Sequence, residues 1–199
     1  MDHRKIGELI RENRMKQALT QRQLAEKLML SDKTVSKWER GMGCPDVGIL
    51  VKLSEILGVD LKALMEGQVK GNEPTGGNMK KLKFYICPHC GNLMTSVSET
   101  EMSCCGKILP PLEAKKADEA HGLNVEVIEN EFFVTSDHGM TKEHYISFLA
   151  LVTGDTLVLK KQYPEWGLDT RLPMLRYGTL YWYCTEHGFF YRHLIKKNE

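Results

Sequence analysis

The sequence predicts a multidomain α + β protein with a five-helix bundle, a small cysteine-rich domain and a C-terminal β-sandwich. Three observations carry this prediction: apolar residues at helical spacing near the start, two cysteine pairs in the middle, and short strand-like segments towards the end. A chain of 199 residues can hold two or three small domains, each with a modest core. We place the domains at residues 1–66 (helices), 84–112 (cysteines) and 113–199 (strands), with a flexible linker at 67–83.

Composition favours a protein of the cytoplasm. No positively charged start leads into an apolar run, and nowhere do about 18 apolar residues follow one another, so we expect neither secretion nor a membrane partner. In a reducing compartment the six cysteines are expected to be metal ligands or free thiols. Residues 1–70 carry 13 Lys and Arg against 10 Asp and Glu, whereas residues 84–199 carry 11 against 15. This basic excess is weak evidence for nucleic acid, so motifs must carry that prediction.

Five helices are predicted before residue 67. Ile6, Leu9 and Ile10 recur at helical spacing and give the first helix its buried side. Thr20 and Gln23 form a capping-box pattern at the start of the second helix. The remaining three helices begin after residues that cap well, which are Ser31, Asp46 and Asp60.

Two segments of this helical region resemble the Cro and phage-repressor class of helix-turn-helix regulators, the XRE family. They are Leu19-Thr-Gln-Arg-Gln-Leu-Ala and Ser31-Asp-Lys-Thr-Val-Ser-Lys-Trp-Glu-Arg-Gly, and the resemblance spans residues 5–65. It implies that a homodimer binds double-stranded DNA and that the third helix of each copy lies in the major groove.

The same resemblance assigns DNA contacts to particular residues. Base edges would be met by Asp32, Lys33, Thr34 and Lys37, and phosphates by Gln21 and Arg40. The residue chemistry agrees, because Lys33 can donate to guanine and Asp32 can accept from cytosine. Arg14 and Glu39 match positions that pair in this class, so we expect a partly buried ion pair that fixes the recognition helix.

Two cysteine pairs predict a first metal site. Residues 67–78 are polar and glycine-rich, which favours a flexible connector in front of it. Cys87-x2-Cys90 and the adjacent Cys104 and Cys105 suit a tetrahedral sulfur site, and this spacing allows zinc or iron. Tyr85-Ile-Cys-Pro-His-Cys-Gly-Asn with Cys-Cys-Gly-Lys resembles desulforedoxin, which implies one iron in a tetrathiolate site; a structural zinc is the alternative.

Six strand-like segments follow, separated by Gly, Asp, Asn and Pro, and they predict a β-sandwich. These segments are residues 125–128, 132–135, 145–152, 156–159, 179–183 and 189–191. His138-Gly-Met-Thr-Lys-Glu-His144 and Cys184-Thr-Glu-His187-Gly resemble the catalytic domain of superoxide reductase, and with the preceding cysteines their order resembles desulfoferrodoxin over residues 84–192.

That resemblance implies an immunoglobulin-like sandwich holding a non-haem iron, bound by four histidines in a plane and one cysteine behind it. The matching ligands are His138, His144, Cys184 and His187, with His121 as the upstream histidine that completes the plane. The sixth position would be open to superoxide, and Glu119 would lie over it as the catalytic residue. Turnover would require an electron donor such as rubredoxin.

One departure bears on activity. The family usually has Glu-Lys before the first histidine, whereas this chain has Glu119 and Ala120. A lysine there would attract an anion, so the sequence leaves superoxide reduction undecided.

Three functions follow from these patterns. The first is a DNA-binding transcriptional regulator whose iron centres sense superoxide, oxidative stress or iron supply. The second is a superoxide reductase, an oxidoreductase, that carries a DNA-binding module. The third is a regulator whose metal domain is a structural scaffold for zinc.

Overall fold

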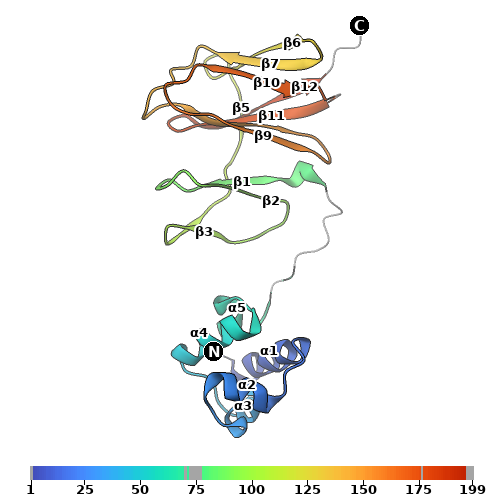
Figure 1. The fold of residues 1–199 in the computed structure, drawn as a ribbon, viewed down its shortest axis with the longest axis vertical. Coiled ribbons are helices and arrows are strands. Elements are labelled where there is room, and N and C mark those ends of the chain that lie inside the picture. Colours follow the sequence, from blue (N-terminus) through green and yellow to red (C-terminus); the bar gives the residue numbers. More distant parts are fainter. Residues whose placement is uncertain (1, 70, 72–77, 176, 196–199) are drawn as a thin grey trace. The chain divides into compact units, whose positions relative to one another are not determined.

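The computed structural model describes residues 2–69, 71, 78–175 and 177–195, and the chain divides into two compact units, Met1–Gly71 and Asn72–Glu199 (Figure 1). Residues 70 and 72–77 of the predicted flexible linker lie outside the described residues, as do the last four residues of the chain. We therefore describe each unit by itself.

The first unit contains the five predicted helices. They are α1 (His3–Lys16), α2 (Gln21–Leu28), α3 (Asp32–Glu39), α4 (Val47–Leu57) and α5 (Leu61–Glu66). Thr20 and Gln23 form the predicted capping box, and the side chains of Ser31, Asp46 and Asp60 each accept a bond from a backbone N–H in the following turn. Asp2 caps α1 in the same way, a start that the sequence pattern did not reveal.

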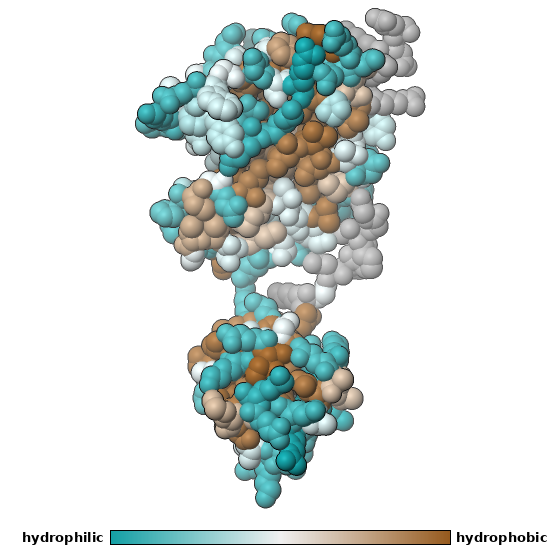
Figure 2. Space-filling view, viewed as in Figure 1, coloured by the Kyte–Doolittle hydropathy of each residue, from teal (hydrophilic) through white to brown (hydrophobic). Residues whose placement is uncertain are grey.

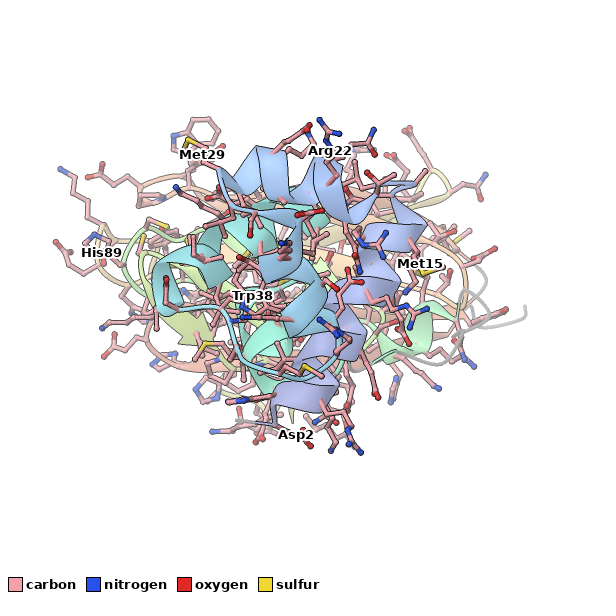
Figure 3. The ribbon with its side chains drawn as sticks, turned by 90° about the horizontal axis from the view of Figure 1, so that it is seen from below. Asp2, Met15, Arg22, Met29, Trp38 and His89 are labelled. Carbon is pink, nitrogen blue, oxygen red and sulfur yellow. The ribbon has the colours of Figure 1, made fainter. Side chains whose placement is uncertain are left out.

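The helices enclose one apolar core. Trp38 of α3 lies among them, whereas Arg22 and Met29 project outwards in the view of Figure 3. Gly7 of α1 lies so close to the Trp38 carbonyl that any larger residue would collide with it. Helices α1 and α3 therefore pack in close contact at this glycine. Apolar side chains also reach the surface, and Figure 2 shows brown patches among the teal on this unit. Among the large apolar side chains that the structure describes, Met29 is the most exposed, at 81%.

A buried ion pair joins α1 to α3, as predicted. The Arg14 Nε lies 2.6 Å from the Glu39 Oε1, and the two side chains are only 11% and 3% exposed. Gln21 donates from its Nε2 to the second Glu39 oxygen at 2.7 Å. Arg14 also donates to the Leu19 carbonyl, so Glu39 and its partners connect α1, α2 and α3.

The second unit is built from strands. A 3-10 helix, η1 (Met79–Lys81), precedes β1 (Lys83–Ile86), β2 (Leu93–Ser96), β3 (Met102–Cys104), β4 (Lys107–Leu109), β5 (Lys115–Lys116), β6 (Asn124–Ile128), β7 (Glu131–Ser136), β8 (Ile146–Val152), β9 (Leu157–Lys161), β10 (Leu168–Pro173), β11 (Tyr177–Cys184) and β12 (Gly188–Ile195). Strands β1 and β2 pair antiparallel, as do β3 and β4.

Two larger sheets form the rest of this unit. One has the order β5-β12-β11-β8-β9 and the other β10-β7-β6, and residues of both sheets share one core around Trp182, Leu149 and Leu172 (Figure 1). The β-rich architecture was predicted; the immunoglobulin-like detail stays a prediction. Strand β10 was missed because its charged and proline residues leave only Leu168 and Leu172 as apolar inward-facing positions.

The cysteine-bearing segment packs against the five-stranded sheet. Phe84 of β1 is 1% exposed, and its ring lies 5.6 Å from the Phe148 ring and 5.3 Å from the Phe189 ring, between centroids. This aromatic cluster holds β1 against the five-stranded sheet.

Among the described residues no helix has the length and apolarity to span a membrane.

Candidate nucleic-acid interface and metal centres

Helix α3 presents a polar face to solvent. Asp32, Lys33 and Lys37 are exposed, while Val35 and Trp38 on the opposite face are buried in the core. The core therefore determines which side chains can reach a groove. The Asp32 Oδ1 accepts the Lys33 backbone N–H at 2.8 Å. The Lys33 and Lys37 ammonium groups are cationic donors on this exposed face.

The other predicted DNA contacts are partly engaged within the unit. The Thr34 hydroxyl lies 2.9 Å from the Ser31 hydroxyl, and one N–H of the Gln21 amide is donated to Glu39. Arg40, exposed at the C-terminal end of α3, donates from its Nε to the Ser36 carbonyl at 3.1 Å. Its terminal nitrogens are thus held near the end of the helix, where a phosphate could meet them.

We predict different effects for the two cations of this face. Lys33→Ala should relax sequence preference by about 1–3 kcal/mol at one base position, because a direct base contact is lost. Arg40→Ala should weaken binding to all sequences alike and reduce the dependence on salt. Selection of binding sites from random DNA measures both, and an unchanged ranking of sites for Lys33→Ala would refute the base-reading role.

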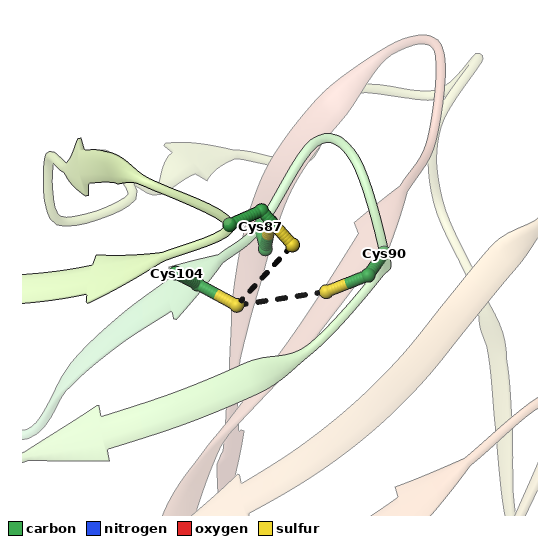
Figure 4. A group of neighbouring side chains, drawn as sticks. Cys87, Cys90 and Cys104 are labelled. Atoms are coloured by element: carbon green, nitrogen blue, oxygen red, sulfur yellow. Dashed lines mark hydrogen bonds between the residues drawn. The ribbon is translucent and has the colours of Figure 1, made fainter.

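Four cysteine side chains converge in the second unit; we call Cys87, Cys90, Cys104 and Cys105 the four-cysteine cluster. Their sulfur atoms all lie within 4.8 Å of one another. The Cys104 sulfur is 3.6 Å from that of Cys90 and 3.9 Å from that of Cys105 (Figure 4). A tetrahedral site with metal–sulfur bonds of about 2.3 Å has sulfur–sulfur edges of about 3.8 Å, so these distances fit one metal ion.

Local turns explain why these sulfurs meet. The Gly91 N–H donates to the Cys87 carbonyl at 2.9 Å, which closes the first turn. In the second turn Cys105 and Gly106 both take left-handed backbone angles, with φ of 50° and 75°. The Cys90 backbone N–H points at the Cys87 sulfur and lowers the pKa of that thiol to about 6, which favours the thiolate that binds metals.

A second group, the His/Cys cluster, consists of His138, His144, Cys184 and His187. Its ligand atoms also lie within 4.8 Å of one another. The Cys184 sulfur is 3.3 Å from the His138 Nε2, and a shared metal with bonds of about 2.3 and 2.1 Å would place these atoms about 3.1 to 3.6 Å apart. The cluster therefore also has the dimensions of a metal site.

The chain brings this cluster together from two connections. His138 and His144 lie between β7 and β8, a segment that we call the ligand loop (residues 137–145), while Cys184 and His187 flank the turn between β11 and β12. The Thr185 hydroxyl donates to the Glu143 carbonyl at 2.9 Å, so the turn is bonded to the loop. Cys184 is buried and His187 is exposed, which leaves the cluster open to solvent on one side.

The hydrogen-bond partners and protonation of the histidine nitrogens suit the binding of a metal cation. The His144 Nδ1 lies 3.4 Å from a Glu186 carboxylate oxygen, while its Nε2 is buried without a hydrogen-bond partner. Burial, reinforced by the neighbouring His144, lowers the pKa of His138 and keeps its imidazole neutral. Neutral imidazoles oriented by a carboxylate are typical metal ligands.

His121 lies beside the His/Cys cluster and not among its four members. Its ring centroid is 4.9 Å from that of His187, and it stacks on Phe190 at 4.7 Å. The Asp118 Oδ1 accepts the His121 backbone N–H at 2.9 Å. The same oxygen lies 2.6 Å from the His121 Nδ1. Glu119, the predicted catalytic residue, is exposed in the same turn.

Sequence reasoning missed the two carboxylates that hold these rings. Asp118 precedes His121 by three residues, and Glu186 directly precedes His187 while contacting His144. A search for acidic residues near each histidine would have found Asp118. The contact of Glu186 with His144 joins two different connections, so no local sequence pattern indicates it.

Known proteins match the two units separately. A helix-turn-helix family model, HTH_3, matches residues 10–64. The chain is 33% identical over 84 residues to the HTH-type transcriptional activator BcrR of Enterococcus faecalis, covering 41% of each protein. A desulfoferrodoxin homolog of Archaeoglobus fulgidus is 32% identical over 89 residues, which are 41% of this chain and 70% of that one.

A desulfoferrodoxin of Clostridium acetobutylicum matches over a longer stretch. It is 26% identical over 119 residues, which are 54% of this chain and 92% of the relative. Together with the two metal-ligand groups, these matches confirm the predicted fusion. The chain belongs to the desulfoferrodoxin family and carries an XRE-type helix-turn-helix domain, which implies a DNA-binding regulator.

Proposed function

We propose that this protein is a sequence-specific transcriptional regulator whose iron centres respond to superoxide, to oxidative stress or to iron supply. One observation carries the proposal: a helix-turn-helix domain and a solvent-open His/Cys cluster occur on the same chain. His187 is exposed, so one side of the His/Cys cluster faces solvent. An open site suits a centre that meets a small oxidant.

The residues present fit iron at both clusters. Four thiolates suit iron or zinc, and imidazoles with one thiolate suit iron that changes its oxidation state. Iron would supply a one-electron redox step at the His/Cys cluster. Of this chain's residues, Cys184 would donate electron density to the metal. Its sulfur accepts the His187 backbone N–H at 3.4 Å, and this hydrogen bond would reduce the electron density that the sulfur donates.

DNA recognition would use two copies of the chain. A single helix-turn-helix module reads few bases, so we propose a homodimer that binds two half-sites about one helical turn apart. The homodimer would bind double-stranded DNA, and superoxide would be its signal.

A superoxide reductase with an attached DNA-binding module is the second candidate. The exposed position of His187 favours it, because a substrate could reach the metal from that side. Glu119 would then act near the open position, and an external donor such as rubredoxin would return one electron per turnover. Ala120 supplies no positive charge, so steering of superoxide would be weaker than with a lysine.

Metal analysis and visible absorption of anaerobically purified protein test the iron assignment. An iron tetrathiolate is red and an oxidised His/Cys iron centre is blue, whereas zinc is colourless. Iron in the His/Cys cluster would support both redox candidates. A colourless protein with zinc in both clusters would leave the scaffold function and contradict our proposal.

A further inference from the structure

The ligand loop contains a methionine between its two histidines. Met140 is half-buried and packs against the core that the two large sheets share. Its sulfur accepts the Ile146 backbone N–H at 3.4 Å, and its carbonyl accepts the Glu165 N–H at 2.7 Å. Through these bonds Met140 attaches the loop to the start of β8 on one side and to the β9–β10 connection on the other.

The β9–β10 connection is held in an unusual conformation. Glu165 adopts a left-handed backbone angle, φ 64°, which costs energy for a residue with a side chain. The Glu165 backbone N–H donates to the Met140 carbonyl, and the Glu165 carboxylate lies 3.9 Å from the Lys142 ammonium. Both contacts are made with the ligand loop. The loop and this connection therefore form one bonded unit, with Met140 at the junction.

We propose that Met140 is a site of oxidative modification that controls whether the His/Cys cluster keeps its metal. The oxidant is hydrogen peroxide, either from the surroundings or as the product of superoxide reduction, and only this last source rests on the proposed function. The sulfur lone pair attacks one peroxide oxygen and forms the sulfur–oxygen bond. The O–O bond breaks, and the second oxygen leaves with both protons as water.

Oxidation would release the loop. The thioether is apolar and a weak acceptor, whereas the sulfoxide carries a strongly polar oxygen. A polar group without a partner is unfavourable in a half-buried site against an apolar core, so the side chain would turn towards water. The Ile146 N–H then loses its acceptor, and His138 and His144 lose the support between them. Sulfoxide formation is reversible by methionine sulfoxide reductases, so such a site could act repeatedly.

The chain offers a matched control. Met174 is also half-buried and also packs against the same core, but it lies outside the ligand loop. Met29 is far more exposed, at 81%, and lies in the other unit. If exposure alone governed oxidation, Met29 would react fastest. If the position between His138 and His144 in the ligand loop governs it, Met140 would react faster than Met174.

The test treats metal-loaded full-length protein with hydrogen peroxide and follows sulfoxide at each methionine by peptide mass spectrometry, together with retained metal. We expect Met140 to be oxidised several-fold faster than Met174 and metal loss to follow the same time course. Met140→Leu should lose metal several-fold more slowly, whereas Met174→Leu should behave like the unmodified protein. Repair with a methionine sulfoxide reductase should restore metal uptake.

Two outcomes would overturn the proposal. Equal oxidation of Met140 and Met174 would show that the loop methionine is not selected, a result that needs no variant. Metal loss from Met140→Leu at the unmodified rate would assign the loss to another residue, such as Cys184. Met140→Gln, which places a permanent polar group there, should bind metal more weakly without peroxide. None of these measurements involves DNA, so they fail or succeed independently of the proposed regulation.

Discussion

Cys104→Ser is expected to remove the metal from the four-cysteine cluster and to destabilise the strand-rich unit. The core beneath this cluster is small, since its buried apolar residues are only Tyr85, Cys87 and Leu109 among those described. Structural metal sites of this kind contribute about 10–16 kcal/mol in small zinc domains. Even a loss of about 3 kcal/mol would lower the Tm by roughly 10 °C.

Cys44→Ser is the control for that change. Cys44 is half-buried in the helical unit and belongs to neither metal-ligand group. Its replacement should leave the metal content and the unfolding of the strand-rich unit unchanged. Metal analysis and calorimetry measure both variants. A Cys104→Ser protein that unfolds at the original temperature would show that the cluster is not structural.

Glu39→Gln should destabilise the helical unit by about 3–5 kcal/mol, because it leaves the Arg14 charge buried without a charged partner. The Glu39 side chain is 3% exposed and accepts from both Arg14 and Gln21. Since Glu39 is the last residue of α3, its loss should also free the recognition helix and weaken DNA binding. Denaturant unfolding of the helical transition measures the first effect.

The pair between Arg22 and Glu26 is a matched control on the surface. Its atoms lie 2.9 Å apart, but the side chains are 82% and 62% exposed. Glu26→Gln should therefore change stability by less than about 1 kcal/mol. Equal effects of the two substitutions would mean that burial does not determine the contribution of the Arg14 pair.

Much of the fold could be predicted from local sequence patterns. Capping residues and helical periodicity were sufficient for the five helices, because each signal lies within one or two turns of the element that it marks. The cysteine cluster was also accessible, since paired cysteines followed by Gly91 and Gly106 define two turns of known geometry. The buried pair of Arg14 and Glu39 came from the resemblance, because 25 residues separate them.

Contacts between distant strands could not be predicted in the same way. Strand β10 carries too few apolar residues to stand out, and its position depends on pairing with β7. The packing of Phe84 against Phe148 and Phe189 depends on the three-dimensional arrangement alone. The position of His121, stacked on Phe190 and held by Asp118, likewise follows from a turn folding back on β12.

We expect the state of the His/Cys cluster to change DNA affinity. Such coupling requires the states to differ in their contacts with the DNA-bound form, and it is typically worth about 1–3 kcal/mol. The direct measurement titrates one selected DNA site with reduced, oxidised and metal-free protein at a single salt concentration, because salt alone shifts these affinities greatly. We predict that affinity differs between states by roughly 5- to 150-fold. We also predict that Cys184→Ala removes the difference between reduced and oxidised protein. Identical binding curves in all three states would show that the cluster does not control DNA binding and would favour a tethered enzyme or an inert scaffold.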